Sequence, residues 1–214
     1  CALEHGHHWR PAHQGNILVA DTGNHRVCVW SLDGAPASCF GGLGSGNGKL
    51  NRPVAVAVSL AGHVFVSDSG NRRLAVFDAQ GTWLRAFDSA SDGSSLFGSA
   101  GPRGLAADAQ GNVYAADPER SRIVKVAADN STSAIGSAGS GVGQMRSPSA
   151  LAVVSGLLYV ADTGNQRVLE LDLSGAFKRA YEIAPLANVD ALAVTSELLF
   201  IADRAGNRVV GFRR

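Results

Sequence analysis

The sequence has few cysteines, no long apolar run and almost no excess of charge. Its 214 residues include three Cys and one Met, and the net charge is +1. Three cysteines are too few for a disulfide scaffold, and no apolar run reaches the length of a membrane span. A net charge this small gives no global field that would recruit nucleic acid or a membrane surface. We therefore expect no membrane partner.

Helical periodicity is also missing. No window of 11–18 residues carries an apolar stripe at helical spacing. Apolar residues make up 45% of the chain, in short runs separated by Gly, Asn, Asp and Pro. This pattern is typical of an all-β protein with many tight turns. The length suits one domain with a sizeable core or a small tandem array.

One segment recurs five times along the chain. Each copy has an apolar run that ends in Asp, then a turn, and then a run that begins with Arg five residues after the Asp. The copies are VADTGNHRVCVW (19–30), VSDSGNRRLAVF (66–77), AADPERSRIVKV (115–126), VADTGNQRVLEL (160–171) and IADRAGNRVVGF (201–212). Self-similarity at a period of roughly 45 residues predicts a repeat architecture.

The Asp-Thr-Gly of two copies resembles the signature of an aspartic protease, which needs two aspartates that share one proton. Five copies do not form such a pair, so we interpret the Asp as a turn residue that accepts backbone N–H groups. We expect the recurring Arg to make charge-assisted hydrogen bonds to neighbouring turns. The structural repeat residues are Asp21, Asp68, Asp117, Asp162, Asp203, Arg26, Arg73, Arg122, Arg167 and Arg208.

Each unit is expected to hold four short strands. A small apolar inner strand such as VAVAV (54–58) precedes the strand that ends at Asp, and a more polar outer strand such as TWLRAF (82–87) follows the Arg strand. Four strands at this period predict a β-propeller blade. The first unit lacks a recognisable inner strand and the fifth ends without an outer strand, so we expect three full blades and two partial ones.

These copies resemble NHL repeats over nearly the whole chain. The segments closest to the family pattern are VADTGNHRV (19–27), VADTGNQRV (160–168) and GSGNGKLNRPVAVAV (44–58). The resemblance implies an all-β propeller of four-stranded antiparallel blades, as part of a six-bladed ring. Two turns depart from the pattern, and altered geometry is expected there: PERS (118–121) replaces the Gly-Asn turn, and in the last copy the Asn moves to Asn207.

The expected organisation is a truncated N-terminal segment at 1–15 followed by the propeller at 16–214. The expected units are about 16–40, 52–88, 101–136, 147–182 and 188–214. Because the chain begins at Cys1 and its one Met is Met145, we expect a piece of a longer protein. Such a piece would leave unpaired strand edges.

Cys28 and Cys39 lie on two runs joined by SLDG (31–34). A two-residue turn would place them opposite each other, whereas a type I turn with Gly34 in a bulge would place Ser38 opposite Cys28. The equivalent turns later in the chain, DAQG and DLSG, favour the bulged form, so we expect free thiols. Free thiols and the absence of a visible signal peptide favour a cytoplasmic location.

Two Gly-rich stretches are interpreted as flexible connections between blades, and a His cluster is interpreted as a disordered or surface cluster. GGLGSGNG (41–48) and GSAGSGVG (136–143) resemble phosphate loops, but Pro and a strand follow them where a phosphate loop needs a helix. The His cluster has no strand pattern that would fix metal-ligand geometry, so no metal or cofactor is expected. Its members are His5, His7, His8 and His13.

The turns between the second and third strands and the connections between blades should share one face of the propeller, because blade strands are antiparallel. Loops on a rigid scaffold commonly carry recognition, and here they form a locally basic rim. The alternative is that these Arg residues only make the loops soluble. The expected binding residues are Arg52, Arg72, Arg103, Arg120, Arg146, Arg204, His25 and Gln166.

The resemblance implies a non-catalytic scaffold that binds a protein partner through this face, such as the substrate-recognition part of a ubiquitin ligase. The three cysteines cannot supply the zinc ligands of a RING domain, so ligase activity would belong to other sequence. No small-molecule substrate is expected.

An alternative is single-stranded RNA binding, which needs exposed aromatic rings beside basic groups. Trp9 and Phe97 are the candidates for exposed rings, and the other aromatics fall within strand patterns and are expected in the core. A second alternative is a metal-dependent propeller enzyme of the peptide-amidating lyase or lactonase type. The inner strands offer only Asp190 and, at their other end, Asp108 as carboxylates, so an enzyme is not expected.

Overall fold

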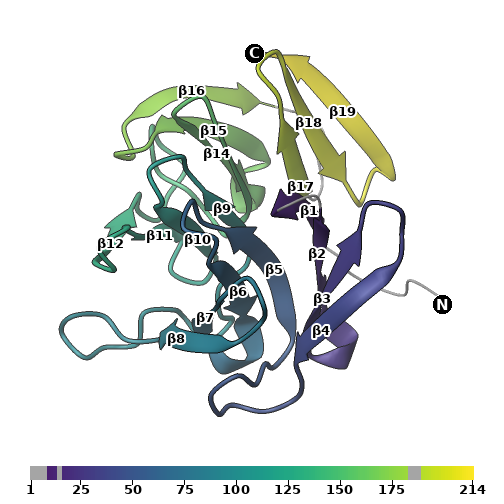
Figure 1. Cartoon of the computed structure of the whole chain (residues 1–214). Coiled ribbons are helices and arrows are strands. Elements are labelled where there is room, and N and C mark those ends of the chain that lie inside the picture. The colour runs from purple at the N-terminus through teal and green to yellow at the C-terminus, as the bar shows by residue number, and fades with distance from the viewer. Residues whose placement is uncertain (1–8, 14–15, 183–188) are drawn as a thin grey trace. The chain divides into compact units, whose positions relative to one another are not determined.

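The computed structural model describes residues 9–13, 16–182 and 189–214 of the chain (Figure 1). Among these residues the regular structure is β-strand, apart from three 3-10 helices of three residues each. The strands form five antiparallel sheets, four of them four-stranded and one three-stranded. The expected all-β class and the four-stranded antiparallel blades are therefore confirmed. No described helix could cross a membrane.

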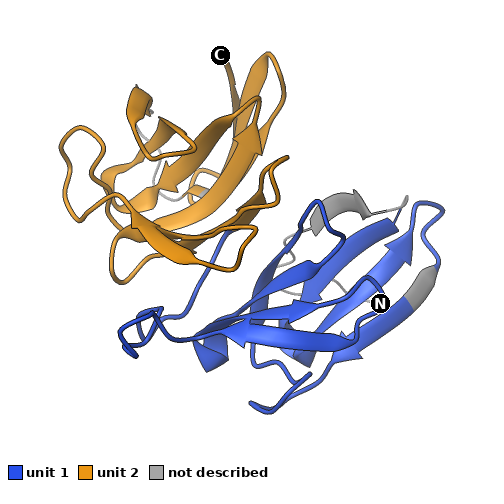
Figure 2. Cartoon of the chain, turned by 60° about the vertical axis from the view of Figure 1, so that its left-hand side comes forward, with its two compact units in different colours: residues 1–104 blue, residues 105–214 orange. Residues whose placement is uncertain are grey.

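The chain divides into two compact units, residues 1–104 and 105–214, coloured separately in Figure 2. Unit 1 holds two sheets, each with its strands in chain order. Their strands are β1 (Trp9–His13), β2 (Asn16–Asp21), β3 (Arg26–Ser31), β4 (Pro36–Gly41), β5 (Pro53–Val58), β6 (Val64–Asp68), β7 (Arg73–Phe77) and β8 (Trp83–Phe87).

Unit 2 holds three sheets, again with sequential neighbours. The first comprises β9 (Leu105–Ala107), β10 (Val113–Asp117), β11 (Arg122–Val126) and β12 (Thr132–Ile135). The second comprises β13 (Pro148–Val154), β14 (Leu157–Asp162), β15 (Arg167–Asp172) and β16 (Phe177–Glu182). The third comprises β17 (Val189–Val194), β18 (Leu198–Asp203) and β19 (Arg208–Arg213).

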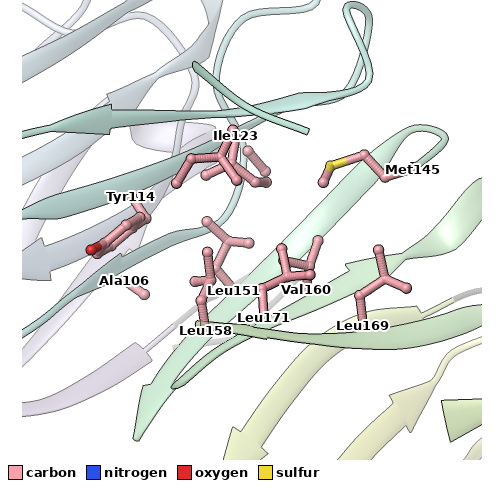
Figure 3. Packing of buried hydrophobic residues seen from close by; sticks show 11 residues of the cluster. Ala106, Tyr114, Ile123, Met145, Leu151, Leu158, Val160, Leu169 and Leu171 are labelled. Carbon is pink, nitrogen blue, oxygen red and sulfur yellow. The ribbon is translucent and has the colours of Figure 1, made fainter. Parts of the chain in front are cut away.

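The core lies between neighbouring sheets within each unit. In unit 1, one cluster joins β2 and β3 to β5, β6 and β7, and in unit 2 another joins β10 and β11 to β13, β14 and β15 (Figure 3). Strands packed on both faces are mostly apolar, and β6, β7 and β10 are buried throughout, including the Asp or Arg at the turn end of each. The outermost strands are covered on fewer sides, and β8 accordingly has exposed and half-buried residues but no buried one.

The expectation that the first unit lacks an inner strand is wrong. Residues Trp9–His13 form β1, which pairs antiparallel with β2 and sets Pro11 opposite Ile17. Proline is depleted in strands and tolerated at sheet edges. β1 is the edge strand of its sheet, so it can contain Pro11. This Pro is the reason that the sequence pattern did not predict a strand here. The last sheet does lack a fourth strand among the described residues, as expected.

The expectation of free thiols is also wrong. Cys28 on β3 and Cys39 on β4 lie directly opposite each other and form a disulfide. Disulfides persist in oxidising compartments and are rare in the cytosol. The argument for a cytoplasmic location that depended on free thiols therefore does not hold.

The bulged turn itself is present, but a second irregularity in β4 cancels the one-residue shift in pairing that this turn produces. At the turn, Gly34 has a φ of 86° and Trp30 pairs with Pro36, as the bulged form requires. One extra residue of β4 then shifts the register, so that Val29 pairs with Ser38 and the two Cys face each other. The same shift occurs between β7 and β8 and between β15 and β16, so it recurs along the chain.

Candidate functional site

The turn after β6 is organised by a fully buried carboxylate. Asp68 Oδ2 accepts hydrogen bonds from Arg73 Nε at 2.7 Å and from Asn71 Nδ2 at 2.8 Å. Asp68 Oδ1 accepts the backbone N–H of Asn51 at 2.6 Å. One side chain therefore joins the turn, the following strand and the connection that enters the blade.

The turn after β14 repeats this arrangement. Asp162 Oδ2 accepts from Arg167 Nε and Asn165 Nδ2, both at 2.8 Å. Asp162 Oδ1 accepts the backbone N–H of Arg146 at 2.6 Å. Both aspartates are 0% exposed, and each accepts three hydrogen bonds from the protein itself, which gives both a structural role.

The Gly-rich connections present carbonyl oxygens to the same arginines. Arg73 donates from Nη1 to Ser45 O at 2.9 Å, and from Nη2 to Gly46 O at 3.1 Å and Lys49 O at 2.8 Å. Arg167 Nη2 donates in the same way to carbonyl oxygens of its own connection, at 2.9 and 3.0 Å. These loops therefore surround a guanidinium with acceptors, which is the opposite of a phosphate-binding loop of N–H donors.

An apolar side chain anchors each of these connections. Leu50 and Met145 are both 0% exposed, and Figure 3 shows Met145 in the same cluster as Ile123 and Leu169. A Cβ on Gly41, whose φ is 110°, would lie 2.8 Å from Leu50 Cδ1, and one on Gly136 would lie 2.5 Å from Met145 Cε. Leu50 and Met145 were not predicted as anchors, although each lies two residues after the end of a Gly-rich stretch.

Hydroxyl groups that link each turn to a later segment of the same unit were also missed. The residue after the Asp is Thr or Ser in three copies: Thr22 and Thr163 donate to the first residue of the next sheet, and Ser69 donates to the segment that follows its own sheet. The bonds run from Thr22 to Pro53 O at 2.7 Å, from Ser69 to Pro102 O, and from Thr163 to Val189 O at 3.2 Å. The recurrence of Thr or Ser after Asp was the signal available in the sequence.

Four predicted binding residues lie in unit 1. Arg52, Arg72 and Arg103 are exposed, and His25 is half-buried. His25 and Arg72 end the 3-10 helices η1 (Thr22–Asn24) and η2 (Ser69–Asn71), both with a φ of 56°. Arg52 donates its backbone N–H to His25 Nδ1 at 3.0 Å, so the structure brings these two residues together.

The other four predicted binding residues lie in unit 2 and are exposed: Arg120, Arg146, Gln166 and Arg204. Gln166 ends the helix η3 (Thr163–Asn165) with a φ of 56°, as His25 does in unit 1. Arg120 takes the place that Asn has in the turns after β2, β6 and β14, and its Nη1 lies 3.9 Å from Asp117 Oδ2. Arg120 is therefore directed partly at its own turn.

The two atypical turns have altered geometry, as expected. Neither PERS (118–121) nor the turn before Arg208 forms a 3-10 helix. Both still place one residue in the left-handed region, Ser121 with a φ of 51° and Asn207 with a φ of 48°. Ser121 Oγ accepts the backbone N–H of Ser147 at 3.3 Å, which reproduces the bond between Arg52 and His25.

The remaining buried carboxylates are also engaged. Asp108 accepts hydrogen bonds from Tyr114 Oη at 2.9 Å and Asn112 Nδ2 at 2.7 Å. Burial alone would raise the pKa of Asp108, but these bonds outweigh it and hold the pKa below its usual range. Burial and the Asp108 carboxylate raise the pKa of Tyr114 well above its usual range.

A second tyrosine cluster surrounds Glu170 in unit 2. Tyr159 and Tyr181 both donate to Glu170 Oε2, at 3.1 and 2.8 Å. Burial and the charge of Glu170 raise the pKa of Tyr159 to about 12. These contacts belong to the core between two sheets, where Glu170 is 8% exposed.

No cluster of three potential metal ligands occurs within residues 9–13, 16–182 and 189–214. The predicted N-terminal His cluster and the side chain of Asp190 lie outside the residues whose side chains the structure describes. Of the two rings proposed for base stacking, Trp9 also lies outside them. Phe97 is 1% exposed, so the expectation that its ring is exposed is wrong.

Comparisons with known proteins agree with this geometry. A model of the NHL repeat matches residues 145–171, which include Asp162 and Arg167. A search of curated proteins finds no significant match. A solved streptogramin B lyase is similar with a TM-score of 0.75 and 12% identity, covering 97% of this chain and 68% of that chain.

Two further solved structures are similar. Virginiamycin B lyase from Staphylococcus aureus, solved as an inactive variant with quinupristin, has a TM-score of 0.72 and 13% identity over 96% of this chain and 64% of that chain. A structure of the nidogen/laminin complex has a TM-score of 0.74 and 22% identity over 93% of this chain and 72% of that chain. At these identities the likeness shows the fold alone. Residues 145–171 thus match the NHL repeat, and the five repeated antiparallel sheets have the fold of β-propeller proteins.

Proposed function

We propose that the chain is a non-catalytic interaction scaffold that binds a protein partner through the loop face of the propeller. The observation that carries the proposal is that exposed Arg side chains lie on loops whose backbone is hydrogen-bonded to buried Asp and Arg side chains. In unit 1, Arg52 and Arg72 flank the connection that Arg73 and Asp68 hold in place. Arg is enriched in protein interfaces, and a preorganised loop loses little entropy on binding.

The buried chemistry of the molecule supports binding over catalysis. The buried carboxylates of Asp68, Asp108 and Asp162 each accept at least three hydrogen bonds from backbone, Asn, Arg or Tyr donors. General acid–base catalysis needs a group that can exchange its proton with a substrate. The propeller fold itself does not decide the question, because the similar structures include both a lyase and a complex of nidogen with laminin.

Protein recognition is favoured over RNA binding by where the aromatic rings lie. Phe65, Phe77, Tyr114 and Tyr159 are at most 6% exposed. Single-stranded RNA recognition depends on rings that stack on bases. Among the members of the predicted face whose side chains the structure describes, the exposed ones are six Arg and Gln166, none of which is aromatic.

The test compares two triple variants that remove the same charge. The face variant is Arg52→Ala, Arg72→Ala and Arg103→Ala, and the control, on outer strands, is Arg85→Ala, Lys178→Ala and Arg179→Ala. Affinity capture from an extract of the source cells should recover a partner with the wild-type chain and the control. The face variant should recover at least about tenfold less, as expected for the loss of about 1.4 kcal/mol of binding free energy.

A second arm uses a labelled random single-stranded RNA pool at low and near-physiological salt. The proposal predicts no binding tighter than about millimolar by either triple variant or the wild type. Micromolar binding that weakens steeply with salt and is lost only in the face variant would replace the proposal with RNA recognition. Equal capture of partners by the two triple variants would contradict the assignment of the loop face.

A further inference from the structure

One asparagine of the chain lies in the acceptor sequence for N-linked glycosylation. Asn130, Ser131 and Thr132 form the triplet Asn-X-Thr, and none of the other asparagines, of which the sequence has ten in all, has Ser or Thr two positions later. Such a triplet is short and also occurs by chance. It indicates glycosylation where the asparagine lies on a surface loop of a protein that enters the secretory route.

Asn130 lies in the exposed turn that joins β11 to β12 (Figure 1). Two backbone hydrogen bonds close this turn, from Ala127 N to Ser131 O at 2.9 Å and from Asn130 N to Ala127 O at 2.8 Å. Residues 128–131 are all exposed, and the half-buried Thr132 begins β12. A bulky glycan on Asn130 would therefore extend into solvent without displacing a packed side chain.

The turn uses a residue with positive φ at this position, but it does not need an asparagine. The equivalent residues in three other sheets are Gly34, Gly81 and Gly175, with φ of 86°, 83° and 97°. Each donates its N–H to the carbonyl three residues earlier, as Asn130 does. Asn130 has a φ of 70°, and Asn tolerates this region. The side-chain amide is thus what distinguishes this turn from the other three.

That amide has no structural role in the described part of the chain. There the side chain of Asn130 makes no hydrogen bond, and neither does the hydroxyl of Thr132. The asparagines of the 3-10 helices differ, because each donates its amide to the Asp three residues earlier. Asn24, Asn71 and Asn165 make these bonds at 2.8 to 3.0 Å. The nitrogen of Asn130 is therefore accessible for a modification.

The disulfide between Cys28 and Cys39 indicates the compartment. Disulfides persist in secreted proteins and in the lumen of the endoplasmic reticulum, and they are rare in the cytosol. An exposed Asn-X-Thr is an acceptor in the same secreted proteins. The two observations are independent, because the disulfide lies in unit 1 and the triplet lies in unit 2.

We propose that Asn130 is a modification site that carries an N-linked oligosaccharide. The donor class is an oligosaccharide joined through its anomeric carbon to a polyprenyl diphosphate. The side-chain nitrogen of Asn130 forms a bond to that carbon, and the bond from the carbon to the diphosphate oxygen breaks. The proton that the amide nitrogen loses ends on the released polyprenyl diphosphate.

The glycan would leave the loop face uncovered. The turn that contains Arg120 follows β10 and the turn that contains Asn130 follows β11, and these two strands are antiparallel. The two turns therefore lie at opposite ends of this sheet. The modification neither obstructs the predicted binding residues of this sheet nor depends on the function proposed for them.

The test maps one tryptic peptide of the natural protein. Trypsin cleaves after Lys125 and Arg146, so residues 126–146 form a peptide that contains the acceptor. The protein is isolated from its source cells and treated with peptide N-glycosidase in water enriched in heavy oxygen. This enzyme converts a glycosylated asparagine to an aspartate that carries the heavy isotope. Mass spectrometry should find the labelled aspartate at position 130 in the treated wild type.

Three variants introduced at the chromosomal gene separate the acceptor from the turn. Asn130→Gly keeps the residue type that the other turns use, and Thr132→Ala keeps the asparagine, and both should lose the glycan completely. Thr132→Ser keeps the hydroxyl and should retain the glycan. An unmodified peptide in the wild type, or an aspartate at position 130 without the heavy isotope, would overturn the proposal. A glycan that persists on the peptide of Asn130→Gly would also overturn it.

Discussion

The same Asp–Arg pair has different surroundings from one blade to the next. In the pairs of Asp68 with Arg73 and Asp162 with Arg167, the Arg side chain is 10% exposed and the Asp is fully buried. In the pair of Asp21 with Arg26 the side chains are 16% and 46% exposed. A buried pair is costly to break from one side, because the remaining charge stays desolvated, whereas an exposed pair contributes little.

The first prediction compares the same substitution in these two settings. Asp162→Asn should lower the free energy of unfolding by about 3–5 kcal/mol, because Arg167 would remain buried without a counter-charge. Asp21→Asn should lower it by about 1 kcal/mol or less. Urea unfolding followed by circular dichroism would measure both. An equal loss of unfolding free energy in the two variants would show that burial does not determine how much the Asp–Arg pair contributes to stability.

The second prediction concerns the tyrosines, of which the chain has three. Burial raises the pKa of all three tyrosines. The Asp108 carboxylate raises the pKa of Tyr114 further, and the Glu170 carboxylate does the same for Tyr159 and Tyr181. A tyrosine whose folded pKa is raised favours the folded state fully below its unfolded pKa of about 10. That contribution is lost as the pH rises through the folded pKa, which is about 12 for Tyr159.

Absorbance of the phenolate near 295 nm should therefore show almost no ionisation at pH 10 in the folded chain. Ionisation should appear together with alkaline unfolding, while the urea-unfolded chain should titrate near pH 10. Reversible titration of all three tyrosines near pH 10, with the circular dichroism spectrum unchanged, would contradict the packing of both tyrosine clusters.

At the scale of elements, the hairpin of β3 and β4 shows what a sequence pattern can and cannot specify. The turn residues predict the bulge at Gly34, and the structure contains it. The extra residue within β4 carries no turn signal, yet it moves every later pair by one position. A one-residue shift decides which side chains face each other, so the sequence alone could not place Cys28 opposite Cys39.

The third prediction follows from that register. The denatured, unreduced chain should take up one alkyl group, at Cys1, and three after reduction, as read by mass spectrometry. Reduction, or Cys28→Ser with Cys39→Ser, should lower the free energy of unfolding by about 2–3 kcal/mol, because the disulfide closes a short loop in the unfolded chain. Uptake of three alkyl groups without reduction would show that the thiols are free.

At the scale of the whole molecule, most of the blade organisation could be predicted because it repeats. Four strands per unit and the place of the Asp and Arg follow from five copies in register. The inner strand β1 was missed because it occurs once and contains Pro11. Thr or Ser recurs after the Asp in three copies, but the hydrogen bonds from Thr22, Ser69 and Thr163 could not be predicted because their acceptors are backbone carbonyls, which any residue type supplies.

The central claim is that the buried arginines hold the blades and the exposed ones bind a partner. Arginine-specific modification by phenylglyoxal, read by mass spectrometry with and without the captured partner, tests it most directly. Arg52, Arg72 and Arg103 should react in the free chain and be protected in the complex. Arg85 and Arg179 should react in both states, and Arg73 and Arg167 in neither. Unchanged reactivity of the loop arginines, with protection confined to the outer strands or to Arg208 and Arg213, would contradict the claim.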